Sequence, residues 1–150
     1  MPAGPRDPAT RKADALARLA TPEIDVWVAT ASPSGEAHLV PLSLAWVGHR
    51  VVIAVAETSV THRNLAASGR ARLAVGPTRD VVMIDALLER TVAVDADEAL
   101  GEAYAAQTDW DPRGDPGYLF LALRPVRLQA WRESNEIAGR TLMRDGAWVV

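Results

Sequence analysis

Residues 24–56, IDVWVATASPSGEAHLVPLSLAWVGHRVVIAVA, decide the fold class, because they contain three apolar segments separated by turn signals. Ile24 to Ala31 is rich in β-branched residues and stops at Ser32-Pro33-Ser34-Gly35, which predicts a strand and a hairpin turn. Ala37 to Trp46 alternates, and Val51 to Ala56 is continuously apolar, as in a strand buried on both faces. Together the three segments predict an antiparallel meander.

The second segment alternates with a period of two, so its side chains fall on two faces. His38, Val40 and Leu42 lie on one face, and Pro41 lies on the other. Because proline has no N–H to donate to a neighbouring strand, Pro41 predicts a sheet edge or a bulge at this point.

Helical signals flank these strands on both sides. Asp7 followed by Pro8 predicts a helix start, and this helix should run to about Ala20. Ser59 and Gly69 predict the cap and the end of a second, shorter helix. The remaining elements that we expect are strands over 71–75, 82–94 and 118–131, a helix over 96–107 and a closing hairpin over 144–148.

Six strands in hairpin order, with helices at the start, after the third strand and before the last strand, favour a mainly β fold. We expect a closed or nearly closed antiparallel barrel with helical caps. A parallel doubly wound sheet fits poorly, because it needs a helix after nearly every strand.

The chain has the size of one domain and no strong charge bias. It has 150 residues, 49% of them hydrophobic, a formal net charge of -3 and no cysteine. These values predict a single domain over 1–150, with a flexible tail over 1–6 and a C-terminal extension over 132–150. They exclude disulfides and thiolate metal sites, and we expect no nucleic-acid partner. No apolar segment precedes the first helix, so we expect a cytoplasmic protein that does not enter a membrane.

The sequence lacks the common motifs of hydrolases, nucleotide kinases and metalloproteases. His38, His49 and His62 lie on three different predicted elements at no ligand spacing, which indicates surface or turn histidines. The acidic loop 109–115 departs from a calcium-binding loop, because Phe120 stands where the final bidentate glutamate belongs. We therefore expect no metal site, and we assign no catalytic side chain.

The segment Glu57-Thr58-Ser59-Val60-Thr61-His62-Arg63-Asn64-Leu65 directly follows a buried strand. Hydroxyls, a guanidinium and free backbone N–H groups gather there at the start of a helix, which is how many proteins bind phosphate. The alternative is an ordinary helix cap with one surface arginine, and Glu57 favours that alternative.

The order of these motifs resembles one known superfamily. A strand, the Ser-Pro-Ser-Gly hairpin, GEAHLVPLSLAW, RVVIAVAE, TSVTHRNL and GRARLAVG follow one another as in the pyridoxamine-phosphate-oxidase-like FMN-binding split barrels, over roughly residues 24–131. The resemblance implies a six-stranded antiparallel split β-barrel with Greek-key order. It also implies a homodimer that holds FMN or, alternatively, the deazaflavin coenzyme F-420 at its interface.

Carried over to this sequence, the resemblance implies a set of cofactor-binding residues. Around the phosphate it places Ser59, Thr61, Arg63 and Asn64, and beside the ring it places Val40, Pro41 and Leu42. Many relatives have a lysine in the place of Thr61, so phosphate binding here would depend more on Arg63 and the backbone amides.

The C-terminal part is similar in layout to that of the true oxidases of this superfamily, in which a basic substrate motif follows a strand tryptophan. The resemblance adds Trp131 and Arg140 to the cofactor-binding set, with Arg132 and Glu136 as candidates to line a pocket from the partner subunit. The alternative is that Trp131 and Trp148 fill the dimer core. The substrate motif itself is not reproduced, which argues against vitamin B6 oxidation.

The resemblance implies a flavin- or deazaflavin-dependent oxidoreductase that transfers a hydride to or from a small organic substrate. A second hypothesis is a non-catalytic carrier or sensor of flavin or haem, because no catalytic residue is assigned. A third is a barrel without a cofactor that serves only in protein association. Visible absorbance of the purified protein, before and after each cofactor is added, separates these hypotheses.

Overall fold

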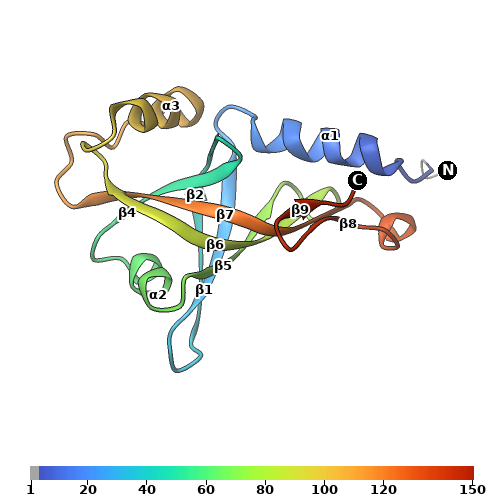
Figure 1. Ribbon diagram of the computed structural model, residues 1–150, viewed down its shortest axis with the longest axis horizontal. Helices are drawn as coiled ribbons and strands as arrows, with labels where there is room; N and C mark the ends of the chain where they lie inside the picture. Colours follow the sequence, from blue (N-terminus) through green and yellow to red (C-terminus); the bar gives the residue numbers. More distant parts are fainter. Residues whose placement is uncertain (1–3) are drawn as a thin grey trace.

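The computed structural model describes residues 4–150 (Figure 1). The expected helix starts are confirmed: Asp7 accepts a hydrogen bond from the Thr10 N–H at 2.8 Å, and Ser59 accepts one from the His62 N–H at 3.1 Å. In chain order the elements are α1 (Pro8–Leu19), β1 (Asp25–Ala31), β2 (Ala37–Ser43), β3 (Ala45–Val47), β4 (Arg50–Ala56), α2 (Val60–Ser68), β5 (Arg70–Val75), β6 (Val81–Ala93), α3 (Glu98–Thr108), β7 (Tyr118–Trp131), the short 3-10 helix η1 (Ser134–Glu136), β8 (Thr141–Arg144) and β9 (Ala147–Trp148).

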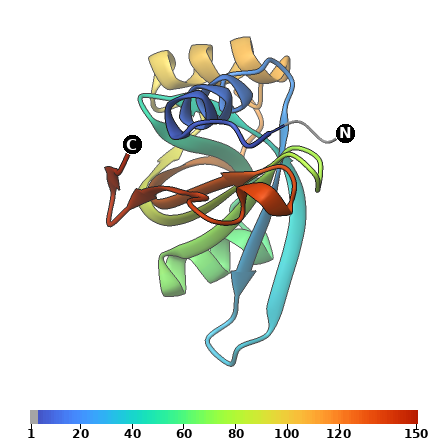
Figure 2. The same cartoon turned by 90° about the vertical axis from the view of Figure 1, so that its right-hand side faces the viewer.

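The strands of residues 4–150 form one antiparallel sheet with the order β2-β1-β5-β6-β7-β4-β3, and β8 and β9 extend it from β7. β2 and β3 are neighbours in the chain but stand at the two ends of this order, so the sheet curls into a barrel that is open between them (Figure 2). The pairings of β1 with β5 and of β4 with β7 join strands that are not consecutive. The fold is therefore the expected mainly β split barrel with Greek-key connections.

Residues 4–150 form nine strands where six were expected. The segment expected as one strand over 37–46 breaks at Leu44, whose N–H donates to the Ile24 carbonyl at 3.1 Å. Before this break β2 pairs with β1, and after it β3 pairs with β4, so the chain crosses the open side of the barrel here. β8 and β9 form the expected closing hairpin, which was not counted among the six. Pro41 lies in the edge strand β2, as predicted.

β4 is buried on both faces, as its continuously apolar sequence predicts. Val51 and Ile53 point into the main core inside the barrel. Val52 and Ala54 point the other way, into a second cluster beneath α3. Figure 2 shows α1 and α3 on one side of the barrel and α2 on the other.

Tyr104 of α3 is fully buried in this second cluster. Its hydroxyl lies near the backbone of Ala54 without reaching hydrogen-bond geometry, and burial raises the pKa of Tyr104. We expect Tyr104→Phe to leave the free energy of unfolding unchanged or to raise it by up to about 1 kcal/mol, because it removes a buried polar group that has no partner. Urea denaturation measures this, and a loss of about 1 kcal/mol or more would show that the hydroxyl has a partner.

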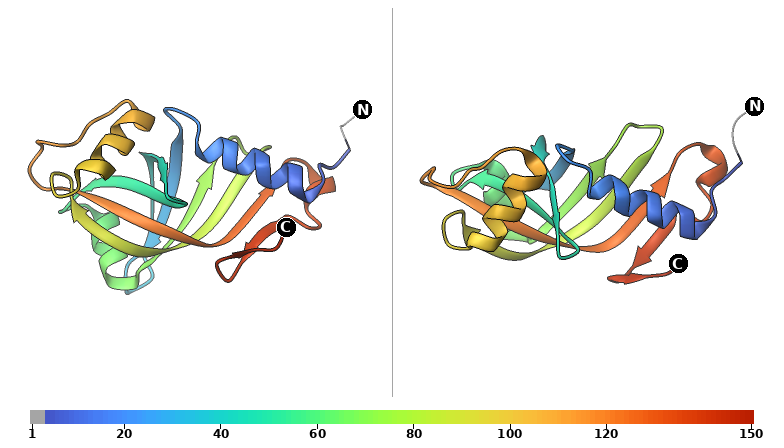
Figure 3. Two further views of the ribbon diagram at one scale, coloured as in Figure 1. Left: turned by 45° about the horizontal axis from the view of Figure 1, so that its top comes forward. Right: turned by 90° about the horizontal axis from the view of Figure 1, so that it is seen from above.

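β6 and β7 are the longest strands and connect the two ends of the molecule. Their pairing shifts register between Asp85 and Ala86 and again between Leu88 and Arg90. Such bulges bend a strand and increase its twist, which lets β6 and β7 follow the barrel wall. α2 and the C-terminal hairpin β8–β9 consequently lie at opposite ends of the molecule (Figure 3).

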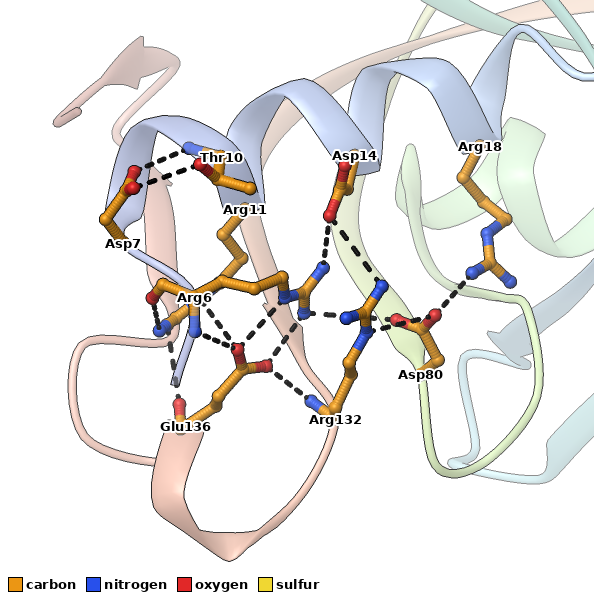
Figure 4. A network of polar contacts seen from close by, with 9 residues as sticks. All are labelled: Arg6, Asp7, Thr10, Arg11, Asp14, Arg18, Asp80, Arg132 and Glu136. Atoms are coloured by element: carbon orange, nitrogen blue, oxygen red, sulfur yellow. Dashed lines mark hydrogen bonds and ion pairs between the residues drawn. The ribbon is translucent and has the colours of Figure 1, made fainter. Parts of the chain in front are cut away.

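A network of ion pairs fastens the N-terminal segment to the C-terminal extension (Figure 4). The Glu136 carboxylate is only 2% exposed, and it accepts hydrogen bonds at 2.8 Å from Arg6 Nη2, from the Arg6 N–H and from the Arg132 N–H. The buried Arg11 lies beside it and donates to the Gly139 carbonyl at 2.8 Å. The tail expected to be flexible over 1–6 is therefore anchored at Arg6, and residues 1–3 lie outside the described residues.

Candidate cofactor-binding site

The expected phosphate site lies at the start of α2, and the local sequence explains its shape. Ser59 is extended and caps the helix, and Gly69 ends it with a φ of 70°, which glycine adopts without strain. Within residues 4–150 the N–H groups of Val60 and Thr61 have no hydrogen-bond partner. They carry the positive end of the helix dipole, so this end of α2 attracts anions.

A hollow of about 520 Å³ lies between α2 and the β1–β2 hairpin. Arg63 and Asn64 line it from α2, and Glu36 and His38 line it from the hairpin. Among residues 4–150 the Arg63 guanidinium has no hydrogen bond and no carboxylate partner. An unpaired guanidinium next to the first turn of a helix is suited to bind a phosphate or a carboxylate.

The four residues expected around the phosphate do not all reach this hollow. Arg63 and Asn64 line it, whereas Ser59 and Thr61 do not. The Thr61 side chain is buried, with 3% of the residue exposed, so its hydroxyl cannot replace the lysine of the relatives. The Asn64 amide donates to the buried Thr30 hydroxyl at 3.1 Å and thereby ties α2 to β1. Arg63 is thus the member of the set whose charge is free to meet a ligand.

The three residues expected beside the ring fall on two faces of β2. Val40 and Leu42 are half-buried and pack against the main core. Pro41 is exposed on the outer face, paired in register with Trp27 of β1. Because neighbouring residues of a strand point to opposite faces, a flat ring cannot contact all three side chains from one side.

Trp131 and Arg140 meet at the other end of the molecule. The guanidinium carbon of Arg140 lies 5.6 Å from the centre of the Trp131 ring, a cation–π contact, and both residues line a hollow of about 330 Å³. Trp131 ends β7, whereas Tyr118 begins β7 opposite Ala56, the last residue before the turn into α2. β7 therefore separates Trp131 from the α2 end of the barrel by roughly 40 Å along the strand.

Within one chain the structure thus forms two separate groups of candidate residues. Arg63 and Asn64 share one hollow, and Trp131 and Arg140 share another. The further C-terminal candidates line neither hollow: Glu136 is buried in its ion-pair network, and Arg132 lies 3.4 Å from Asp80. Trp148 packs against the main core of its own chain, with the Lys12 ammonium 4.5 Å from its ring centre.

Sequence reasoning did not place Glu36 or His38 in the hollow. His38 was interpreted as a surface or turn histidine, because its spacing to the other histidines matches no metal site. The period of two in β2 puts His38 on the same face as Val40 and Leu42, and this alternation was the one sequence signal that could have grouped His38 with other site residues. Its position opposite Arg63 depends on the packing of α2 against β1, which no local pattern encodes.

The fold and the hollows define a class of protein, an antiparallel split barrel with capping helices and a hollow that contains an unpaired arginine at the helix that follows β4. A family model described as pyridoxamine 5'-phosphate oxidase matches residues 13–132. The chain belongs to the pyridoxamine 5'-phosphate oxidase family.

Solved structures of other proteins are similar to this chain at low sequence identity. An F420 reductase gives a TM-score of 0.61 at 19% identity, and the match covers 73% of this chain and 92% of that one. A heme binding protein from Mycobacterium smegmatis gives 0.65 at 21% identity, over 91% of this chain and 57% of that one. A pyridoxamine 5'-phosphate oxidase-related, FMN binding protein from Nostoc punctiforme PCC 73102 gives 0.54 at 14% identity, over 83% of each chain. At these identities the likeness shows the shared fold.

No curated protein matches the chain. In the part of the chain that the structure describes, no helix combines the length and the apolar character that crossing a bilayer requires. Residues 4–150 also contain no group of three or more His, Cys, Asp or Glu side chains placed to hold a metal ion.

Proposed function

We propose that two copies of this chain form a homodimer that binds FMN or, alternatively, a deazaflavin of the coenzyme F-420 type. The dimer acts as an oxidoreductase on a small organic substrate, and we assign this activity to the cytoplasm. The unpaired Arg63 guanidinium in the hollow beside α2 is the observation that carries the proposal. Membership of the pyridoxamine 5'-phosphate oxidase family supports it.

The residues of the Arg63 hollow fit a phosphate group. Arg63 offers charge and paired N–H donors, and the first turn of α2 adds backbone N–H groups close by. His38 faces them from β2 as a further donor, and Glu36 is the carboxylate that lines the same hollow. A hollow of this size, with an unpaired guanidinium beside a helix N-terminus, suits the phosphate end of a flavin-type cofactor.

A second copy of the chain accounts for the separation of the two candidate groups. A two-fold axis would place Trp131 and Arg140 of one protomer beside the Arg63 hollow of its partner. An apolar patch on the outer face of the barrel supports such an interface, because Trp27 is 49% exposed and Leu39 is 61% exposed on the paired strands β1 and β2.

A bound flavin or deazaflavin supplies the hydride transfer. The residues of the chain bind and orient it. Arg63 holds the phosphate end, and the Trp131 indole, with Arg140 beside it, offers a flat apolar surface to the ring system. No side chain of the Arg63 hollow is assigned as an acid or a base.

Visible absorbance tests the proposal directly. Purified protein titrated with FMN, and separately with the deazaflavin, should bind one of them with a change in the cofactor spectrum. The same sample in size-exclusion chromatography with light scattering should have the mass of two chains. A monomer that takes up neither cofactor would refute the proposal.

Arg63→Ala should weaken binding of that cofactor by about 10- to 100-fold, the usual loss for one charge-assisted hydrogen-bond partner. Arg79→Ala is the matched control, because Arg79 is exposed and pairs with Glu133 at 3.1 Å outside the hollow. Unchanged affinity in Arg63→Ala would mean that the phosphate binds elsewhere.

A non-catalytic carrier of flavin or haem is the second candidate. His38 favours it, because this imidazole lines the hollow and is a common ligand of haem iron. The two candidates differ in turnover: a carrier binds the cofactor, and lets it be reduced, without oxidising or reducing any small acceptor. Titration with haem, followed by the visible spectrum of wild type and His38→Ala, tests the haem arm.

A further inference from the structure

The outer face of the sheet carries two rows of side chains across β5, β6 and β7. The pairing places Arg70, Leu87 and Arg124 in one row and Arg72, Asp85 and Arg127 in the next. Arg70 and Arg72 alternate along β5, as Asp85 and Leu87 do along β6, so each pair shares a face. On β7 the bulge opposite Asp85 and Ala86 adds one residue between Arg124 and Arg127, so both of them still pair with that face. Four arginines therefore face one carboxylate on this part of the sheet.

These residues line a concave surface. Arg70, Arg72 and Arg124 line a hollow of about 920 Å³. Arg72 and Asp85 also line the hollow of about 330 Å³ that contains Arg127, so the two hollows adjoin at this ion pair. We call these two adjoining hollows the arginine trough, and its apolar lining includes Leu87 and Met83.

The charges of the trough are not balanced within residues 4–150, because five arginines, Arg140 included, line it together with two carboxylates, those of Asp85 and Asp145. Asp85 accepts from Arg72 Nε at 2.7 Å and from Arg72 Nη2 at 3.3 Å, which uses both carboxylate oxygens. Arg124 reaches only Glu89, at 3.8 Å. The guanidinium groups of Arg70 and Arg127 have neither a hydrogen bond nor a carboxylate partner among residues 4–150.

In the described chain as a whole most arginines pair with a carboxylate. The exceptions are Arg63, Arg70, Arg127, Arg140 and Arg144. Three of these exceptions line the two hollows of the trough, in a chain whose net charge is -3. Like charges held this close repel one another, so a bound anion would relieve the repulsion.

We propose that the arginine trough binds an elongated organic anion that carries two or more carboxylate or phosphate groups. The two rows offer guanidinium pairs at the spacing of successive charges on such a molecule, and the apolar lining accepts its carbon chain. This site adds to the Arg63 hollow and extends from the hollow of Trp131 and Arg140, to which the proposed function assigns the ring system. Arg70 and Arg124 line only the other hollow, so anion binding there does not require a bound flavin. Two kinds of molecule carry such groups: a free polyanionic metabolite and a cofactor with an acidic tail.

Isothermal titration with a triglutamate peptide and with tripolyphosphate tests the trough. Wild-type protein should bind at least one of these probes, and Arg70→Gln/Arg127→Gln should weaken this binding at least tenfold. Both side chains are exposed and unpaired, so the double variant should keep the wild-type Tm. Arg79→Gln/Arg90→Gln is the matched control, because it removes the same charge from exposed pairs outside the trough.

The outcomes decide the site and its occupant. The proposal is supported if probe binding weakens in the trough variant but not in the control variant. If FMN-loaded protein binds the probe as tightly as cofactor-free protein does, the natural occupant is a free anion. The occupant is the tail of the cofactor if a deazaflavin with an acidic tail binds at least tenfold more tightly than its tailless form and the trough variant loses this preference. No binding of either probe, or equal weakening in both double variants, would overturn the site. Arg63→Ala separates it from the proposed function, because that variant should lose the cofactor but keep the probe.

Discussion

Glu136→Gln should lower the free energy of unfolding by about 3–5 kcal/mol, the largest effect on stability that we expect from one substitution. In a chain of this length that loss corresponds to a fall in Tm of roughly 6–20 °C. The carboxylate is buried against Arg6 and Arg11. Its neutral amide would leave the buried Arg11 without a counter-charge, and Arg6 would keep only the more exposed Asp14 and Asp80. Arg11 Nε already lacks a hydrogen bond, so the site has no spare acceptor.

Glu133→Gln is the matched control for this substitution. Glu133 lies three residues earlier, is exposed, and pairs with Arg79 at 3.1 Å. Exposed pairs contribute about 0–1 kcal/mol, so this variant should unfold almost as wild type does in urea. If the two variants lost equal stability, the Glu136 network would not be what holds the C-terminal extension to α1.

The same network makes stability depend on pH. Hydrogen bonds from Arg6 hold the pKa of Glu136 at about 2, below its ordinary value of 4.5. The unfolded chain therefore takes up a proton at this residue before the folded chain does, so the stabilisation is complete above pH 4.5 and is lost as the pH falls towards about 2. The difference in unfolding free energy between wild type and Glu136→Gln should shrink over that range, as urea titrations at successive pH values would show.

Mixing two inactive variants should restore cofactor binding, which is the largest functional effect that we expect. Arg63→Ala and Arg140→Ala should each bind poorly as homodimers, because every site would lack one of its two cationic groups. If each site combines Arg63 of one protomer with Arg140 of the other, a mixed dimer has one intact site. Equal amounts, mixed and allowed to exchange protomers, should bind cofactor at about a quarter of all sites.

The outcome depends on which protomers form a site. If Arg63 and Arg140 of the same protomer acted together, every protomer of the mixed dimer would lack one group, and no binding would return. Mixing Arg63→Ala with the double variant Arg63→Ala/Arg140→Ala is the control, because no intact Arg63 is present. Cofactor absorbance after gel filtration measures the occupied fraction.

Local patterns in the sequence predicted the elements well. Asp7 and Ser59 cap their helices where predicted, because an N-cap depends on a side chain and on N–H groups two or three residues further on. Pro41 lies in an edge strand, because a residue without an N–H weakens any central strand. The break at Leu44 was missed, since alternation continues through it and only the change of neighbouring strand reveals it.

The candidate site was predicted in part. Arg63 and Asn64 were placed in one group, and they share one hollow. His38 was missed, and Thr61 was expected to face the ligand although the helix turns it inward. The rotation of a helix on its sheet decides which side chains face outward, and that rotation is set by packing partners such as Thr30, which lies 34 residues from Asn64 in the chain.

By itself the sequence determined the strands, the helix caps and the mainly β class, because each depends on neighbours within a few residues. Tertiary structure alone decided that Arg6 meets Glu136, 130 residues away, and that the unpaired arginines of β5 and β7 share one face. The physical reason is that both depend on how distant segments pair: a shift of one residue in strand pairing moves every side chain to the other face, and the bulge between Asp85 and Ala86 sets the register between the two rows.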